Sequence, residues 1–211
     1  MIHRDTITPK MEEVARELHT SLPQSYYLAG GTALALLTGH RESVDLDYFT
    51  PEHIDTMRLK TLLLSMFPKV VFTYEDVDTL WCDIDGVKVS FIARPVMLLD
   101  PPQEEGHFRI ASVRDLVAMK LNAVCGRDEY KDYYDLAELA TMTDAREWGI
   151  WWRQVYPQSD PIAWMVALSH VGSVAPVSLR GSVIRSYKEV EEKILAVVKE
   201  LSSFVGRASA P

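Results

Sequence analysis

The stretch from Tyr26 to Phe49, YYLAGGTALALLTGHRESVDLDYF, constrains the fold of this chain more than any other. Its short apolar start ends at Gly30-Gly31, which is typical of a strand that breaks into a turn where the backbone comes close to another group. Thr32 to Thr38 has the composition of one short helix, and Gly39 is a typical residue to end it. An alternating run from Val44 to Phe49 follows. The pattern therefore predicts a strand, a glycine turn, a helix, a loop and a second strand.

The glycine turn, Gly30-Gly31-Thr32, has two interpretations. Backbone amides at the start of a helix bind phosphate, and two glycines leave the approach to them open. An ordinary turn between a strand and a helix contains the same residue types, because short glycine motifs recur by chance. The turn alone does not decide between these interpretations.

Two carboxylates lie on the strand that follows the turn. Because side chains alternate along a strand, Asp45 and Asp47 share one face, while Leu46 and Tyr48 lie on the other. At about 6 Å and an effective dielectric of about 20, the repulsion between two carboxylates is of order 3 kcal/mol. A divalent cation would convert this repulsion into affinity, and oxygen ligands favour Mg²⁺ or Mn²⁺ over zinc. The alternative is a solvated edge strand.

A second polar pattern lies at Val113 to Leu139, VRDLVAMKLNAVCGRDEYKDYYDLAEL. Its first part predicts a helix that carries Lys120 and stops at Gly126. On the next predicted helix, Asp132 and Asp135 are three residues apart and share a face. Taken alone, Lys120 has the features of a surface lysine, and the two aspartates have those of an acidic pair favoured by the helix dipole.

Together and in this order, the two patterns resemble the motifs of the polymerase-β-like nucleotidyltransferase superfamily. Within it, they are similar to the AbiEii-type toxins of bacterial toxin–antitoxin and phage-defence systems. The resemblance covers roughly Tyr26 to Leu139. It implies an α/β (α+β) fold with a nucleotidyltransferase-like mixed β-sheet lobe over residues 1–106 and a C-terminal all-helical lobe over residues 107–211. The active site is then expected between the two lobes.

The resemblance also implies roles for individual residues. The glycine turn would hold the terminal phosphates of a nucleotide, and Lys120, at a solvated cleft, would neutralise charge on the reacting phosphates. Asp132 would complete the acidic site, with support from Asp135. The implied catalytic residues are Asp45, Asp47, Lys120 and Asp132; the implied nucleotide-binding residues are Gly30, Gly31, Thr32, Lys120, Arg127, Lys131 and Asp135; the implied ligands of Mg²⁺ or Mn²⁺ are Asp45 and Asp47.

The implied activity is transfer of a nucleoside monophosphate from a nucleoside triphosphate to an acceptor. By the same resemblance, the acceptor is an RNA, such as the 3′ end of tRNA, or a protein side chain, and a separately encoded antitoxin restrains the enzyme. Two alternatives stay open: a catalytically silent nucleotide- or partner-binding module of the same fold, and metal-dependent hydrolysis of a phosphoester by the same carboxylates.

One position departs from the superfamily pattern. Three further strands are predicted at Val70 to Tyr74, Leu80 to Ile84 and Val87 to Ile92, the last two joined through the hairpin signal Asp85-Gly86. The sheet would then have about five strands. The last of these usually carries the third metal-binding carboxylate of the superfamily, but Ser90 stands in its place. Asp83 and Asp85 could substitute, although acidic residues next to a hairpin are more often solvated.

Composition limits the partners. The formal net charge is −8 and the pI is near 5.3, which argues against sequence-independent coating of nucleic acid. Two cysteines and no signal peptide or long apolar run favour a soluble protein in the reducing cytoplasm, without a membrane partner.

Trp148, Trp151 and Trp152 have a spacing that fits base stacking or, more often, a helical core.

Overall fold

The computed structural model describes residues 2–160, 162–181 and 185–208. The chain forms two compact units. The first comprises Met1–Met97 and Pro101–Ser112, and the second comprises Leu98–Asp100 and Val113–Pro211. Each unit has its own buried core, with Leu34 and Phe91 among the fully buried side chains of the first and Tyr133 and Trp148 among those of the second.

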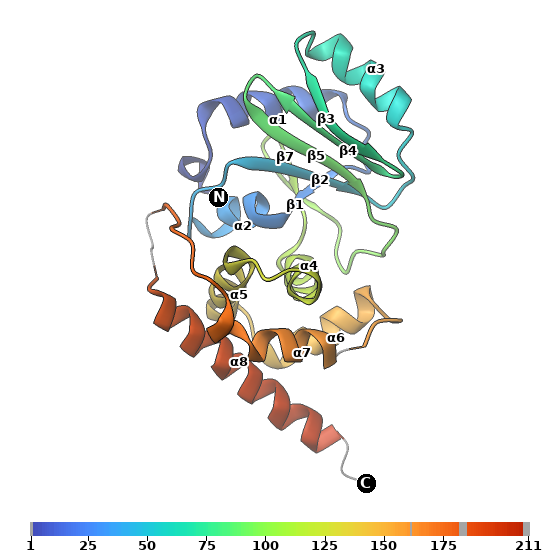
Figure 1. Cartoon of the computed structure of the whole chain (residues 1–211). Coiled ribbons are helices and arrows are strands. Elements are labelled where there is room, and N and C mark those ends of the chain that lie inside the picture. Colours follow the sequence, from blue (N-terminus) through green and yellow to red (C-terminus); the bar gives the residue numbers. More distant parts are fainter. Residues whose placement is uncertain (1, 161, 182–184, 209–211) are drawn as a thin grey trace. The chain divides into compact units, whose positions relative to one another are not determined.

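The first unit is built on one mixed sheet, in the strand order β3-β4-β5-β2-β1-β7-β6 (Figure 1). The strands are β1 (Tyr27–Ala29), β2 (Asp45–Thr50), β3 (Val71–Asp76), β4 (Thr79–Ile84), β5 (Val87–Ala93), β6 (Gln103–Glu105) and β7 (Phe108–Ile110). The sequence predicts the first five. The last two are additional, and each has only three residues, too few to show an alternating pattern.

The two faces of this sheet differ in polarity. Along β2, β4 and β5, one set of alternating residues is buried, including Leu46, Leu80 and Val89. Helix α1 (Pro9–Ser21) contacts β2, β5 and β7 and buries its own apolar stripe, which includes Leu18. Thr8 caps this helix by accepting a hydrogen bond from the Met11 amide. The alternate residues of the strands form a polar face.

The predicted order of strand, turn, helix and strand is confirmed. Helix α2 (Gly30–Thr38) begins directly after β1, two residues earlier than expected, and ends at Gly39. β1 pairs antiparallel with β2, so Ala29 lies opposite Asp47. β2 in turn pairs parallel with β5. The first unit also contains the short 3-10 helix η1 (Arg4–Thr6) and helix α3 (Thr56–Met66).

The hairpin between β4 and β5 is also confirmed. Asp85 and Gly86 have φ values of 53° and 87°, the left-handed backbone that a two-residue hairpin turn of this kind requires. The turn sets the register between the strands, so that Trp81 lies opposite Ser90 and Asp83 lies opposite Lys88.

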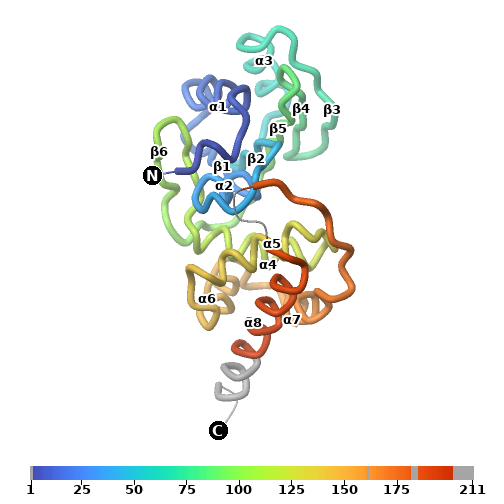
Figure 2. The backbone as a smooth tube through the Cα atoms, turned by 90° about the vertical axis from the view of Figure 1, so that its left-hand side faces the viewer, coloured from blue at the N-terminus to red at the C-terminus, as the bar shows by residue number. Residues whose placement is uncertain are grey.

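The second unit is helical (Figure 2). Its helices are α4 (Val113–Gly126), α5 (Tyr130–Met142), α6 (Ala145–Val155), α7 (Ile162–Ser169), η2 (Val171–Ser173) and α8 (Tyr187–Ala208). α4 contacts α5, α6 and α7, and α8 contacts the same three helices. Trp148, Trp151 and Trp152 are buried, so these rings belong to the core and not to a base-stacking surface. None of the helices within the described residues is long and apolar enough to cross a membrane.

Candidate active site

Asp45 and Asp47 lie on the polar face of β2, as the alternation predicts. Both are partly exposed, while Leu46 between them is fully buried. The two carboxylates belong to successive rows of the sheet: Asp45 pairs with Lys88 of β5, and Asp47 pairs with Ser90. The strand therefore presents two acidic groups side by side and anchors them through the apolar residue between them.

The Asp47 carboxylate contacts both the glycine turn and β5. Its Oδ2 would lie 2.8 Å from a Cβ added to Gly30, whose φ is +70°. A side chain at position 30 is therefore excluded both by the backbone conformation and by the carboxylate. On the other side, the Ser90 hydroxyl donates a hydrogen bond of 2.5 Å to Oδ1 of Asp47. The residue that replaces the expected third carboxylate is thus a hydrogen-bond donor to the second.

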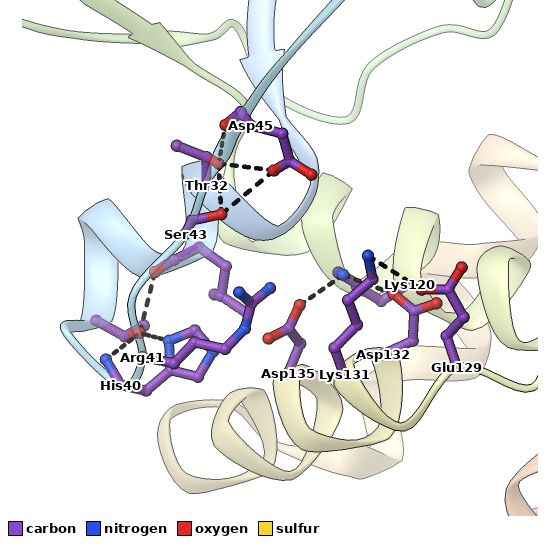
Figure 3. Close-up of polar contacts among 12 residues, drawn as sticks. Thr32, His40, Arg41, Ser43, Asp45, Lys120, Glu129, Lys131, Asp132 and Asp135 are labelled. Atoms are coloured by element: carbon purple, nitrogen blue, oxygen red, sulfur yellow. Dashed lines mark hydrogen bonds and ion pairs between the residues drawn. The ribbon is translucent and has the colours of Figure 1, made fainter. Parts of the chain in front are cut away.

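Asp45 is held by two hydroxyl groups (Figure 3). The Thr32 hydroxyl lies 2.7 Å from the Ser43 hydroxyl and 3.3 Å from Oδ1 of Asp45, and it also donates to the Asp45 backbone carbonyl. Ser43 donates to the same Oδ1 at 3.4 Å. Thr32 is fully buried, and its side chain orients Asp45, while its backbone amide lies in the first turn of the helix.

Arg41 also belongs to this site, although no sequence motif marks it. A Cβ on Gly31 would lie 2.2 Å from Nη2 of Arg41, so the guanidinium rests directly on the glycine turn. The side chain is buried, and Nη1 donates to the Glu42 carbonyl at 3.0 Å. The guanidinium therefore adds a full positive charge to the first turn of α2, where the helix dipole is also positive. The only sequence signal was its place in the polar loop between α2 and β2.

The donor set of the first unit suits a hard cation that keeps part of its own hydration. Asp45 and Asp47 supply carboxylate oxygens, and Thr32, Ser43 and Ser90 surround them with hydroxyls. Within the described residues, no three His, Cys, Asp or Glu side chains gather as a metal-binding group. Two carboxylates fit Mg²⁺, which is commonly held by one or two carboxylates together with waters and substrate phosphates.

In the second unit, Lys120 of α4 lies between Asp132 and Asp135 of α5 (Figure 3). Its Nζ is 2.7 Å from Oδ1 of Asp132 and 2.5 Å from Oδ2 of Asp135. The lysine side chain is 5% exposed and both carboxylates are fully buried. The expectation of a solvated Lys120 is therefore wrong, because α5 supplies two carboxylates that stabilise its charge in the interior.

The charges of this cluster support one another. Burial alone lowers the pKa of Lys120, but the negative charges of Asp135 and Asp132 outweigh this effect and raise its pKa above the ordinary value. Burial alone raises the pKa of Asp132, but the charge of Lys120 and the hydrogen bonds from Arg127 and Lys120 lower it overall. Both groups are consequently charged at neutral pH.

The two other predicted cations are more exposed. Arg127 donates from Nε to Oδ2 of Asp132 at 2.7 Å and from Nη2 to Oδ1 at 3.2 Å, with about half of its side chain exposed. Lys131 lies 3.0 Å from Oε2 of Glu129 and is 40% exposed. Arg127 thus joins the buried cluster, whereas the ammonium group of Lys131 pairs with Glu129.

The sequence matches the family described as nucleotidyl transferase AbiEii toxin, Type IV toxin–antitoxin system, over residues 15–150. This span includes every residue of the two clusters. The chain belongs to the AbiEii family. It is also 35% identical over 129 residues to a protein of Aquifex aeolicus described as uncharacterized, a match that covers 59% of this chain and 62% of the relative.

Solved structures share the fold. JHP933 from Helicobacter pylori superposes with a TM-score of 0.59 at 17% identity, over 94% of this chain and 91% of that one. MenT4, a nucleotidyltransferase toxin from Mycobacterium tuberculosis, has a TM-score of 0.55 at 15% identity, over 92% and 82% of the two chains. ANT(2″)-Ia, solved with adenylyl-2″-tobramycin, has a TM-score of 0.51 at 13% identity, over 72% and 99%. The fold is therefore that of the nucleotidyltransferases.

Proposed function

We propose that this chain transfers a nucleoside monophosphate from a nucleoside triphosphate to an acceptor, and that it acts as the toxin of a toxin–antitoxin pair. The observation that carries the proposal is the placement of Asp45 and Asp47 on one face of β2, with Asp47 against the Gly30 backbone. Membership of the AbiEii family supports it. The MenT4 toxin and ANT(2″)-Ia show that the fold is shared by proteins described as nucleotidyltransferases or solved with a nucleotidylated product.

In this proposal, Asp45 and Asp47 hold one or two Mg²⁺ or Mn²⁺ ions. Such an ion, when bound, neutralises charge on the phosphates and orients the reacting oxygens. Thr32 and Ser43 keep the Asp45 carboxylate directed toward the polar face of the sheet, and Ser90 does the same for Asp47. The protein thus fixes both carboxylates before the substrate binds, which is the preorganisation that electrostatic catalysis needs.

The first turn of α2 would bind the terminal phosphates. The amides of Gly31 and Thr32 lie at the positive end of the helix, and the guanidinium of Arg41 rests on the same turn. The oxygen of an acceptor hydroxyl would bond to the α-phosphorus while the bond to pyrophosphate breaks, and the hydroxyl proton would pass to solvent. Holding the reactants in line adds to the electrostatic stabilisation in lowering the barrier of such a reaction.

The helical unit would contribute Lys120, with Asp132 and Asp135 as positioning residues. An ammonium has three N–H donors, and two of those of Lys120 are directed at these carboxylates. Because Lys120 and Arg127 occupy the Asp132 oxygens, orienting Lys120 fits Asp132 better than binding a metal. We also propose that the side chains of Lys120, Arg127 and Lys131 contact the nucleotide.

The acceptor class is the open part of this function. We propose RNA, such as the 3′ end of tRNA, with a protein side chain as the other acceptor, and a separately encoded antitoxin as the restraining partner.

One structural observation favours the second candidate, a catalytically silent binding module: Ser90 occupies the strand position paired with Asp47, where a carboxylate is expected.

The test is incubation of the protein with each labelled triphosphate, Mg²⁺ and total cellular RNA and protein. We expect labelled RNA or labelled protein with the wild type, and a loss of at least roughly 100-fold with Asp45→Asn or Asp47→Asn. Glu13→Gln is the control, because Glu13 lies on α1, its side chain is 52% exposed and it pairs with Lys10. No label in any fraction, with bound triphosphate, would establish the silent module instead.

A further inference from the structure

Two aromatic rings lie exposed on the sheet of the first unit. Tyr74 of β3 and Trp81 of β4 pack against each other with ring centroids 4.7 Å apart and planes tilted by 41°. Their exposed fractions are 44% and 46%. The other four tryptophans, Trp148, Trp151, Trp152 and Trp164, are at most 7% exposed, so Trp81 differs from every other tryptophan of the chain.

The strand register places these rings in line with the candidate active site. Asp47 pairs with Ser90, Ser90 pairs with Trp81, and Trp81 pairs with Tyr74. Residues that pair across neighbouring strands direct their side chains to the same face of a sheet. At about 4.8 Å between strands, Trp81 lies about 10 Å from Asp47 along this row and Tyr74 about 14 Å.

The neighbouring row on this face carries a cation. Asp45 pairs with Lys88 and Lys88 pairs with Asp83. Lys88 is exposed and lies two residues before Ser90 on β5, on the same face of the sheet. A ligand that covers the rings and extends toward the carboxylates would therefore pass a positive charge on β5, between the aromatic strands and β2.

Hairpin stability alone does not explain the exposure of both rings. A cross-strand aromatic pair stabilises a hairpin, but the gain grows with the area that the rings bury. Here both rings leave close to half of their surface in solvent, on the face that carries Asp45 and Asp47. Proteins that bind single-stranded nucleic acid carry exposed aromatic side chains on which bases stack, because every base has a flat face that can pack on a ring. An exposed aromatic pair beside a polar site fits this arrangement.

We propose that Tyr74 and Trp81 form a stacking platform for an unpaired base of a single-stranded RNA acceptor. This inference rests on the proposed function. The row of paired residues would direct the strand from the rings across Ser90 toward Asp47, where its terminal hydroxyl reacts. Stacking also suits a chain with a formal net charge of −8, because it needs few phosphate-neutralising cations.

The binding test uses the fluorescence of Trp81. A short single-stranded oligoadenylate should quench the tryptophan emission of the wild type, because Trp81 is the exposed tryptophan. Duplex RNA of the same length should not, since its bases are already stacked. Trp81→Phe should lose the quenching but bind nearly as well, and Trp81→Ala should bind roughly 5- to 150-fold more weakly. Leu64→Ala is the matched control, because Leu64 is 48% exposed and lies on α3.

The kinetic test shows whether the two rings stack on a base of the RNA acceptor or on the base of the triphosphate. With the RNA labelled in the transfer assay, Trp81→Ala and Tyr74→Ala should raise KM for the RNA and leave KM for the triphosphate unchanged. A higher KM for the triphosphate alone, or lost affinity only for an antitoxin protein, would overturn the platform. Quenching by oligoadenylate without transfer to any RNA or protein would support base stacking on the platform and reject the proposed function, so the two failures are distinct.

Discussion

The Ser90 hydroxyl donates a hydrogen bond to Oδ1 of Asp47 from the position on β5 that pairs with it. The two residues are 43 positions apart in sequence, and the parallel register of β2 and β5 brings them together. A neutral donor thus stands where the sequence resemblance led us to expect a third carboxylate. The acidic site of this chain has two charges on β2 and a hydroxyl beside them.

Ser90→Asp should change the metal response of the protein. A third carboxylate opposite Asp47 adds repulsion of about 1–3 kcal/mol without metal, which would lower Tm by roughly 2–10 °C. Mg²⁺ with a triphosphate should then raise Tm more than in the wild type, because the ion relieves the repulsion and binds more tightly. Differential scanning fluorimetry with and without Mg²⁺ measures both effects.

Ser90→Ala is the control for this experiment. It removes the hydrogen bond to Asp47 and should cost about 1 kcal/mol, with no larger shift on addition of Mg²⁺. If the wild type, Ser90→Asp and Ser90→Ala all respond equally to Mg²⁺, then Ser90 does not face the metal-binding position.

Lys120→Ala should destabilise the helical unit. It leaves the fully buried carboxylates of Asp132 and Asp135 without the ammonium between them, and breaking a buried ion pair in this way costs about 3–5 kcal/mol. Lys131→Ala is the matched control, because Lys131 is 40% exposed and should cost about 0.5 kcal/mol or less. Urea unfolding followed by circular dichroism gives the free energies of unfolding.

A double variant separates stability from activity. Adding Asp135→Asn to Lys120→Ala removes one of the two buried negative charges that Lys120 contacts, so part of the stability should return. Transfer activity should stay at least roughly 100-fold below wild type if Lys120 neutralises charge on the reacting phosphates. Activity that recovers together with stability would reduce Lys120 to a structural residue.

The same cluster should make stability depend on pH at both extremes. The pKa of Asp132 is lowered by folding, so its contribution is complete above the ordinary value of about 3.9 and is lost as the pH falls through the folded pKa. The pKa of Lys120 is raised, so its contribution is complete below about 10.4 and is lost as the pH rises through the folded pKa.

Unfolding curves at acid and alkaline pH check this expectation. The wild type should lose stability more steeply than Lys120→Ala above about pH 10.4, and more steeply than Asp132→Asn below about pH 3.9. If the free energy of unfolding depends on pH in the same way in all three proteins, then folding does not shift the pKa of Asp132 or Lys120.

Gly31→Ala should weaken binding of the triphosphate. The new Cβ would lie 2.2 Å from Nη2 of Arg41, so the guanidinium must leave the glycine turn. Loss of a charged phosphate contact costs about 1.5–3 kcal/mol, which corresponds to a KM higher by roughly 10- to 150-fold. Gly126→Ala is the control, because a Cβ there meets nothing within 4 Å.

The pair of Gly31 and Arg41 can be tested further as a cycle. If Gly31→Ala acts by displacing the guanidinium, it should have little additional effect in an Arg41→Ala background, because the clash is gone. Fully additive effects on KM would show that the glycine acts through its backbone alone.

The sequence by itself determined the local parts of this protein. The alternation of Val44 to Phe49 placed Asp45 and Asp47 on one face, because the period of two is a property of the extended backbone. Gly30 marked the turn into α2, and Asp85-Gly86 marked the hairpin, because each of these residues has a positive φ, a backbone conformation that glycine and aspartate allow.

The tertiary structure decided which distant side chains meet. Ser90 faces Asp47, and Trp81 lies in the same row, because of strand register, which depends on pairing between segments far apart in the chain. Lys120 is buried because α5 packs against α4 and supplies two carboxylates from its inner face. Arg41 reaches Gly31 only because the loop between α2 and β2 folds back over the turn. These contacts depend on long-range packing, which no local sequence pattern encodes.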